Sequence, residues 1–306
     1  MSEFEKRDME KLKGAIAVFI GASSFGLLST FVKKAYAQDY TLGQVTGVQA
    51  IFGMIILWMV YLFIQLLNPK ANESFSRKSN KWKIVISGIS TGLVSLVYYK
   101  CVQLVPASLA IVLLMQYIWI GTLIEFIIFK NRPSGRQLIG IAIVLIGTVF
   151  ATGLLEHGID KLNWTGMIYG LLAATAYAVF LIVNGRVGND YPPIQKSALM
   201  VTGSCVMICC IFPPTFLISG VLGDSIWHYG LILSFFGTVI PPLLFAYGIP
   251  KIGYSLSGIL SSAELPVATA MSYFILKEAV SPIQWVGVLL ILATVIWLNS
   301  KKEETV

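Results

Sequence analysis

Long apolar segments separated by short polar connections run along the whole of the 306-residue chain. A helix rises about 1.5 Å per residue, so about 20 apolar residues cross a hydrocarbon core about 30 Å thick. We therefore predict an all-α integral membrane protein. The pattern predicts ten transmembrane helices, near residues 13–33, 42–67, 83–104, 107–129, 136–154, 164–185, 194–219, 227–249, 254–276 and 282–299.

Composition agrees with this class. Hydrophobic residues make up 56% of the chain and charged residues 12%, whereas globular proteins average about 25% charged residues. The formal charge of +7 resides mainly in the short connections, which is typical of membrane orientation, so we predict no nucleic-acid partner. The four cysteines lie in apolar segments without metal-ligand spacing, and we predict no metal and no cofactor.

The basic residues predict how the chain is oriented. Of the 22 Lys and Arg residues, 17 fall on the side of the N-terminus and 4 on the other side. The positive-inside rule therefore predicts a multi-pass protein of the cell (cytoplasmic or inner) membrane with both termini cytoplasmic, residues 1–12 and 301–306 being the tails. The first apolar run is too long for a signal peptide and is interpreted as the first span.

An internal repeat divides the chain into halves. A shift of 147 residues aligns residues 103–149 with 250–296 without a gap, and ten of the 47 aligned positions are identical, among them Lys130 with Lys277. Five spans in each half force the second half to begin on the opposite side of the membrane, which predicts two inverted five-helix repeats with binding near the midplane between them. The predicted repeats cover residues 13–155 and 163–300.

The residue that departs most from the apolar pattern is Glu264, in the ninth span. Ten helical residues from Tyr254 rise about 15 Å, which puts this carboxylate near the midplane. A carboxylate there indicates a functional site, or else a hydrogen-bonded contact between helices. Pro266 lacks a backbone donor and predicts a bend beside it. The repeat places Tyr117 of the fourth span at a similar depth, where both side chains could face one cavity.

Other candidates for substrate binding are polar or aromatic residues, for which helix packing is the alternative interpretation. Ser261 lies on the face of the ninth helix that carries Glu264. Lys100, near the outer end of the third span, either receives a substrate carboxylate or reaches to the membrane interface. The remaining candidates are Tyr99 and Gln103 on the third span, Gln116 and Trp119 on the fourth, and Ser24, Phe25, Tyr177 and Tyr247.

Two carboxylates are candidates for roles in a transport cycle. Glu264 is a candidate for proton coupling or for binding a substrate ammonium group, because burial favours a protonated carboxyl and a nearby cation favours the carboxylate. Glu125 lies near the inner end of the fourth span, within about a turn of Lys130. It is a candidate inner-gate contact, and simple neutralisation of nearby basic residues is the alternative.

Short motifs in both halves resemble those of a known family. The first half has Gly21-Ala22-Ser23-Ser24 before an aromatic residue, and the second half echoes it at residues 173–177. The run of residues 261–267, with its glutamate and proline, is followed by the helix end at 276–279 and by residues 284–287. These residues resemble the drug/metabolite transporter superfamily, in its ten-helix branch with two EamA-type repeats. The resemblance implies movement of small metabolites, often amino acids and commonly outward, by alternating access through a central cavity.

We therefore expect a secondary transporter that exports a small polar or zwitterionic, amino acid-like metabolite, with the lipid bilayer and this substrate as its partners. No phosphate loop of the Walker type is present, so direct use of ATP is not expected. No HExxH or GxSxG motif is present either, and we predict that the protein is not an enzyme. A membrane-embedded enzyme and a non-transporting membrane scaffold are the alternatives.

Overall fold

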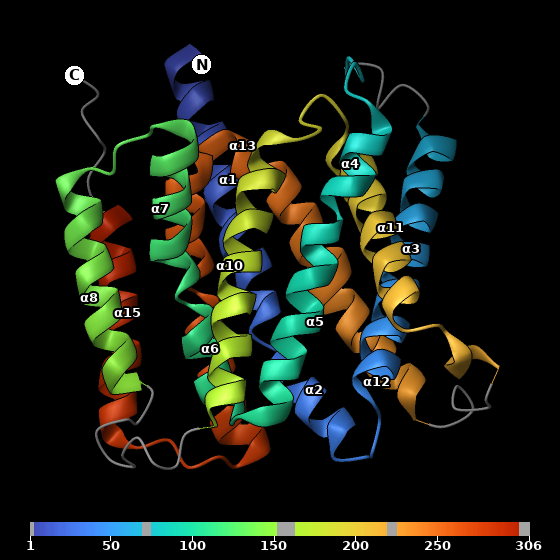
Figure 1. Cartoon of the computed structure of the whole chain (residues 1–306). Coiled ribbons are helices and arrows are strands. Elements are labelled where there is room, and N and C mark those ends of the chain that lie inside the picture. Colours follow the sequence, from blue (N-terminus) through green and yellow to red (C-terminus); the bar gives the residue numbers. More distant parts are fainter. Residues whose placement is uncertain (1–2, 69–74, 152–162, 219–224, 300–306) are drawn as a thin grey trace.

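The computed structural model describes residues 3–68, 75–151, 163–218 and 225–299, and these ranges contain only helices and their connections. The helices stand side by side (Figure 1). We call the face where the first helix begins and the last helix ends the terminal face, and the opposite face the distal face. The elements are α1 (Glu3–Phe25), α2 (Leu28–Tyr36), α3 (Leu42–Leu67), α4 (Lys81–Ser87), α5 (Ile89–Leu104), α6 (Ala107–Leu114), α7 (Tyr117–Phe129), α8 (Gly135–Ala151), α10 (Trp164–Arg186), α11 (Pro193–Ile211), the 3-10 helix η3 (Thr215–Leu217), α12 (Ile226–Leu233), the π-helix η5 (Ser234–Val239), α13 (Ile240–Ser261), α14 (Glu264–Met271), the π-helix η6 (Ser272–Leu276) and α15 (Pro282–Asn299).

These elements make up ten membrane-spanning helices. Within the described ranges, eight helical segments are long and apolar enough to cross a membrane, and two shorter apolar helices lie at Gly135–Ala151 and Pro282–Thr294. Some spans consist of two elements in succession, such as α1 with α2 and α6 with α7. The helix α13 contains the end of the eighth span and the start of the ninth, separated by Gly253 at φ 79°. The predicted all-α membrane fold is confirmed.

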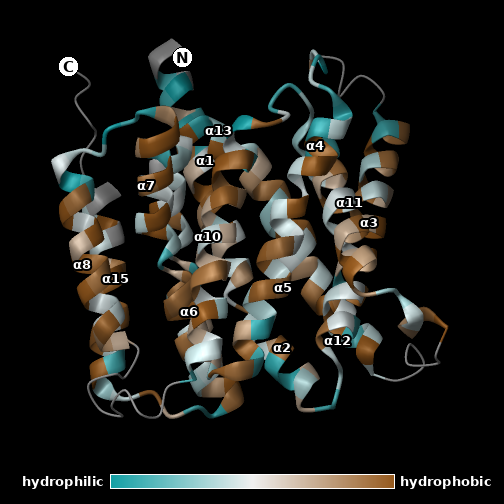
Figure 2. Ribbon diagram, in the orientation of Figure 1, coloured by the Kyte–Doolittle hydropathy of each residue, from teal (hydrophilic) through white to brown (hydrophobic). Residues whose placement is uncertain are grey.

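Hydrophobic residues predominate along the middle of the helices, and hydrophilic residues gather toward the helix ends and connections at both faces (Figure 2). Large apolar side chains are exposed along α3, α8 and α15, as expected for helices that face hydrocarbon. Trp82, Trp164, Trp227 and Trp297 are exposed near helix ends, where tryptophan anchors helices at the membrane interface.

Three spans are broken near their middles, whereas the apolar pattern alone predicted continuous helices. α1 gives way to α2 at Gly26 and Leu27, α6 to α7 at Met115 and Gln116, and α13 to α14 at Ser262 and Ala263. At each break a backbone N–H donates to the carbonyl three residues earlier, over 3.2 to 3.3 Å, which tightens the helix by a 3-10 turn. The breaks leave polar backbone groups near the middle of the bundle.

The bend near Pro266 lies before Glu264 rather than at the proline itself. Pro266 is the third residue of α14, where its missing N–H would have no helical partner in any case. The equivalent break in the first half has Trp119 at the position of the proline (266 − 147 = 119), so the proline is not needed to form a break here.

The same shift of 147 residues superimposes the elements of the two halves. It maps α6 onto residues 254–261, which are the last turns of α13, and α7 onto residues 264–276, which are α14 and η6. Lys130 and Lys277, which follow these segments, both adopt a left-handed conformation with φ 59°. Tyr117 and Glu264 are therefore the first residues of equivalent half-helices, one in each repeat.

Helix packing follows the inverted symmetry. α1 packs on α13, and the equivalent contact in the other half is α10 on α5. α3 packs on α11 and α8 packs on α15, and each of these pairs joins equivalent spans of the two repeats. The α8 and α15 pair lies at one edge of the molecule (Figure 1). The fold thus consists of two inverted five-helix repeats, and residues of both repeats contribute to a common buried core cluster.

A close crossing of two backbones joins the third span to α11. A Cβ atom added at Gly88 would lie 1.7 Å from the carbonyl oxygen of Met200, and one added at Gly203 would lie 1.7 Å from that of Val85. Two backbones therefore touch at this crossing, as small residues allow in membrane helices.

We predict that Gly203→Ala lowers the free energy of unfolding by about 1–3 kcal/mol, because the new methyl group forces the two backbones apart. Thermal unfolding of the purified protein in detergent measures the change. Gly135→Ala is the matched control, since a Cβ atom there meets nothing within 4 Å. Equal losses in the two variants would contradict close packing as the cause.

Candidate functional site

The centre of the candidate site is the carboxyl group of Glu264, which is only 3% exposed. It is the first residue of α14 and follows the break in the ninth span. One of its oxygens, Oε2, has no hydrogen bond. The broken first span lies against this residue, because a Cβ atom added at Gly26 would meet the Glu264 carbonyl oxygen at 2.7 Å.

Tyrosines from three other spans surround this carboxyl group. Tyr117, Tyr177 and Tyr98 are buried beside it, on α7, α10 and α5. The Tyr117 hydroxyl donates to the carbonyl oxygen of Gly258 at 2.7 Å, and its ring meets that of Tyr177 edge to face at 4.7 Å between centroids. Tyr117 and Glu264 therefore belong to one buried cluster, and their place on a common cavity stays a prediction.

Several buried polar atoms in this part of the core have no hydrogen bond. They belong to Ser29 and Thr30 of α2, Tyr177 of α10, Ser261 of α13, and Thr269 of α14. The hydroxyls of Tyr177 and Ser261 lie close to each other and to Glu264 without a well-formed hydrogen bond. Because an unpaired buried polar group is costly, a bound polar molecule or water is the natural partner of these atoms.

Aromatic rings close the site on the side of the terminal face. Phe25 of α1 lies edge to face with Tyr177 at 6.0 Å and with Phe245 of α13 at 5.7 Å between centroids. Phe180 stacks on Tyr177 at 5.8 Å and lies 6.0 Å from Phe245. Glu264 is therefore separated from the terminal face by a layer of rings from three helices.

At the terminal face, Glu125 of α7 forms an ion pair with Arg186 of α10, at 2.8 Å. This partner, rather than the nearby Lys130, is the cation that it contacts directly. Glu125 also accepts a hydrogen bond from Asn131 at 2.7 Å, and the Arg186 guanidinium lies 3.5 Å from the centroid of the Phe129 ring. The ion pair joins the first repeat to the second, which is the position expected of a gate contact.

On the distal side, Tyr99 belongs to a hydrogen-bonded chain that runs away from Glu264. Its hydroxyl donates to Gln49 at 2.6 Å, and Gln49 donates to Thr238 at 3.0 Å. The Tyr36 hydroxyl donates to the carbonyl oxygen of Tyr99 at 3.2 Å. Ser24 donates to the carbonyl oxygen of Phe236 at 2.7 Å. These bonds fasten the first, second, third and eighth spans together.

Glu278 forms a second contact between the repeats, at the distal face. Its carboxylate accepts hydrogen bonds from the backbone N–H groups of Ala107 and Ser108, at 3.0 and 3.2 Å, and from the hydroxyls of Ser108 and Ser272, at 3.0 and 2.5 Å. Partial burial opposes ionisation, but these hydrogen bonds outweigh it and lower the pKa of Glu278 from its ordinary value of 4.5. The end of the ninth span thereby caps the start of the fourth.

The other sequence candidates lie away from the central cluster. Gln116 accepts a hydrogen bond from the indole N–H of Trp119 at 3.0 Å and donates to Thr148 of α8 at 3.3 Å. Lys100 donates to Gln103 at 2.8 Å in an exposed pair on α5. Tyr247 lies near the terminal face, where the Lys251 ammonium sits 3.5 Å from the centroid of its ring. In the described ranges, no three His, Cys, Asp or Glu side chains gather as they would around a metal ion.

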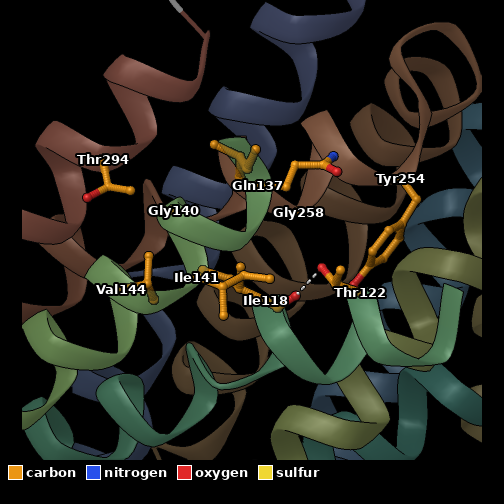
Figure 3. A pocket seen from close by; sticks show the side chains of 10 residues that line it. Ile118, Thr122, Gln137, Gly140, Ile141, Val144, Tyr254, Gly258 and Thr294 are labelled. Atoms are coloured by element: carbon orange, nitrogen blue, oxygen red, sulfur yellow. Dashed lines mark hydrogen bonds between the residues drawn. The ribbon is translucent and has the colours of Figure 1, made fainter. Parts of the chain in front are cut away.

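A narrow cleft lies behind the cluster, between α7 and α8 on one side and α13 and α15 on the other (Figure 3). Its cavity volume is about 20 Å³, enough for about one water molecule. Tyr254 and Gly258 belong to its wall, and the Tyr117 bond to Gly258 separates it from Glu264. Its lining residues are Ile118, Thr122, Gln137, Gly140, Ile141, Val144, Tyr254, Gly258, Ile259 and Thr294.

Sequence reasoning missed Tyr98, Ser29 and Glu278. Tyr98 precedes the predicted candidate Tyr99 and lies close to Ser29 of α2 and to Glu264, whereas the Tyr99 hydroxyl donates to Gln49 of α3. A choice between adjacent residues depends on helix rotation, which the apolar pattern of the third span does not define. Glu278 lies in the helix-end motif of residues 276–279, directly after the ninth span. A carboxylate at that place can accept hydrogen bonds from the start of a neighbouring helix, which is the signal that could have identified it.

The helices, their inverted repeats and the closed polar cluster between them define a membrane transporter. The sequence profile of the EamA-like transporter family matches residues 12–153 and 164–300, and the chain belongs to this family.

Individual relatives agree with this class. The uncharacterized transporter YcbK of Bacillus subtilis is 23% identical over 94% of this chain and 92% of its own length. The threonine/homoserine exporter RhtA of Escherichia coli K12 is 23% identical over 68% of this chain and 67% of its own length. A solved crystal structure superimposes with a TM-score of 0.67 at 15% identity, covering 94% of this chain and 98% of the other, which shows a shared fold.

We predict that Glu278→Gln lowers the free energy of unfolding near neutral pH by about 1–3 kcal/mol, because hydrogen bonds to a charged acceptor are lost. Since folding lowers the pKa of this carboxyl, its stabilisation is complete above the ordinary value of 4.5 and is lost as the pH falls through the lower, folded-state pKa. The two proteins should therefore converge in acid. Thermal unfolding in detergent between pH 7 and pH 3 tests this, and a constant difference down to pH 3 would contradict it.

Proposed function

We propose that this protein is a secondary transporter that exports a small zwitterionic, amino acid-like metabolite, with Glu264 in the substrate site. The observation that carries the proposal is a buried carboxyl with an unpaired oxygen, placed between two inverted repeats and surrounded by tyrosine and serine hydroxyls. The likeness to a protein named as a threonine/homoserine exporter supports the choice of an amino acid-like substrate.

The chemistry of the cluster fits a zwitterion. The free oxygen of Glu264 is an acceptor for a substrate ammonium group, and the unpaired hydroxyls of Tyr177 and Ser261 are donors for its polar atoms. A proton and an ammonium group would compete for the same carboxyl. This competition would couple outward movement of the substrate to inward movement of a proton.

The contacts at the two faces fit alternating access. In the described state, Glu125 with Arg186 closes the terminal face and Glu278 with the start of α6 closes the distal face. Opening at the terminal face would break the Glu125 ion pair and keep the Glu278 contacts, and opening at the distal face would do the reverse. The helix breaks at Met115 and at Ser262 would be the points of bending. We place the terminal face in the cytoplasm, because most Lys and Arg residues lie on that side.

For the site, we predict that Glu264→Gln reduces substrate flux in proteoliposomes about tenfold, the effect of losing one charge-assisted hydrogen bond, and removes its dependence on a pH gradient. The measurement is uptake of a panel of radiolabelled amino acids and amines by vesicles, with and without a gradient. Asp39→Asn is the matched control, because it removes one carboxylate from an exposed turn at φ 60°, which asparagine tolerates. Wild-type flux at every pH in the Glu264 variant would assign this residue a structural role, and no flux of any compound by the folded wild type would refute the transporter.

For the orientation, we predict that a cysteine at Gln38 reacts with an impermeant maleimide on intact cells and that one at Lys83 reacts only after permeabilisation. Both positions are exposed, on the distal and terminal faces respectively. The variants would be made in a background without the four native cysteines. The reverse labelling pattern would overturn the assignment of the terminal face to the cytoplasm.

A further inference from the structure

The cleft behind the site has properties that the transport site does not require. It lies in the half of the bundle nearer the terminal face, since Gln137 is in the first turn of α8 and Thr294 is near the end of α15. Its lining is mainly apolar, with Ile118, Ile141 and Ile259 among its residues. Along α8 it extends from Gln137 to Val144, which is about 10 Å of helix.

The cleft has no counterpart at the equivalent residues of the other repeat. The residues equivalent to Gln137 and Gly140 in the distal half are Gln284 and Gly287 (137 + 147 and 140 + 147). Gln284 donates to the carbonyl oxygen of Ala151 at 3.3 Å, and the backbone of Gly287 lies against that of Ala151. The residues equivalent to this part of the cleft are therefore closely packed at the distal end. At the terminal end α8 and α15 are also joined, because Arg136 donates a hydrogen bond to the carbonyl oxygen of Trp297, and the cleft lies below this contact, between these two helices and α7 and α13.

Positive charge borders the terminal end of the cleft. Lys130 and Arg132 are exposed in the connection between α7 and α8, and Arg136 begins α8 beside the lining residue Gln137. The Arg136 guanidinium lies 5.0 Å from the ring centroid of Trp297, one turn beyond Thr294. From residue 126 to 151 the sequence contains these three cations and no Asp or Glu.

We propose that this cleft is a binding site for one anionic phospholipid of the leaflet at the terminal face. The chain of the lipid occupies the apolar cleft, and the phosphate lies among Lys130, Arg132 and Arg136. An apolar groove that opens at the side of the bundle favours contact with a hydrocarbon chain over contact with a polar metabolite, and a small outward shift of the lining side chains would seat the chain more deeply. Basic side chains at the membrane surface attract anionic headgroups, and the bilayer supplies the ligand at high concentration.

The position of the cleft gives the lipid a route to the transport site. Its chain would contact Tyr254, Gly258 and Ile118, and Gly258 accepts the hydrogen bond from Tyr117. A filled cleft would therefore support the segment that carries Tyr117 from behind. Binding of the lipid nevertheless does not depend on the identity of the transported substrate.

The test is native mass spectrometry of the full-length protein, delipidated in detergent and titrated with phosphatidylglycerol or phosphatidylcholine. One phosphatidylglycerol should be retained at a concentration at which phosphatidylcholine is not. Lys130→Gln with Arg132→Gln should weaken its affinity about 30-fold, or about fivefold for each charge near the membrane surface. Ile141→Trp, which fills the cleft, should abolish retention while leaving the basic residues intact.

Two matched controls separate this site from general attraction to the protein. Lys81→Gln with Lys83→Gln removes the same charge from the start of α4, and Ile139→Trp enlarges an exposed side chain of α8. Neither should change the affinity. Equal retention of the two lipids, equal loss in the controls, or an unchanged Ile141→Trp variant would overturn the proposal. Displacement of phosphatidylglycerol by soluble glycerol phosphate would also overturn it, because the headgroup alone would then account for binding.

Discussion

The cost of burying the Glu264 carboxyl is the constraint on which the central part of the structure depends. A carboxyl group in the middle of ten apolar helices needs polar neighbours, and a continuous helix offers none from its backbone. Side chains from four helices meet at one level, those of Tyr117 and Glu264 from broken spans and those of Tyr98 and Tyr177 from α5 and α10, and the residues that gather there are mostly tyrosines. A phenol combines an apolar ring, which packs, with one hydroxyl, which pairs. The site can therefore be closed and still contain unpaired polar atoms.

The inverted repeat was largely predictable from the sequence, because span length, short connections and the positions of Lys130 and Lys277 follow from local chemistry. The depths of Tyr117 and Glu264 followed from the same shift, and the structure gives them equivalent places at the start of α7 and α14. A bend beside Glu264 was predicted from Pro266, and the ninth span is broken at Ser262 and Ala263. The breaks in the first and fourth spans were not predicted, since apolar residues such as Met115 and Leu27 carry no signal of a tight turn.

The sequence predicted some residues of the candidate site and not others, because it indicates the depth of a residue in the membrane but not the direction of its side chain. Residues chosen by depth, such as Tyr177 and Phe25, lie in or beside the cluster. Residues chosen as polar neighbours in sequence, such as Gln116 and Lys100, point to other helices or to the outside. Depth follows from counting residues along a helix, whereas direction follows from the rotation of that helix against its neighbours. A single sequence with uniformly apolar spans contains little information about rotation.

Equivalent positions at the two faces exchange their chemistry. Glu125 and Asn131 of the first half correspond to Ser272 and Glu278 of the second (125 + 147 and 131 + 147), so the carboxylate and its neutral partner have changed places. One carboxylate meets a partly exposed guanidinium and the other meets backbone N–H groups. Dissolved salt screens the first kind of contact far more than the second. Two halves with the same backbone geometry are therefore joined by contacts that differ in their response to ionic strength, so added salt weakens the attachment of the repeats at one face more than at the other.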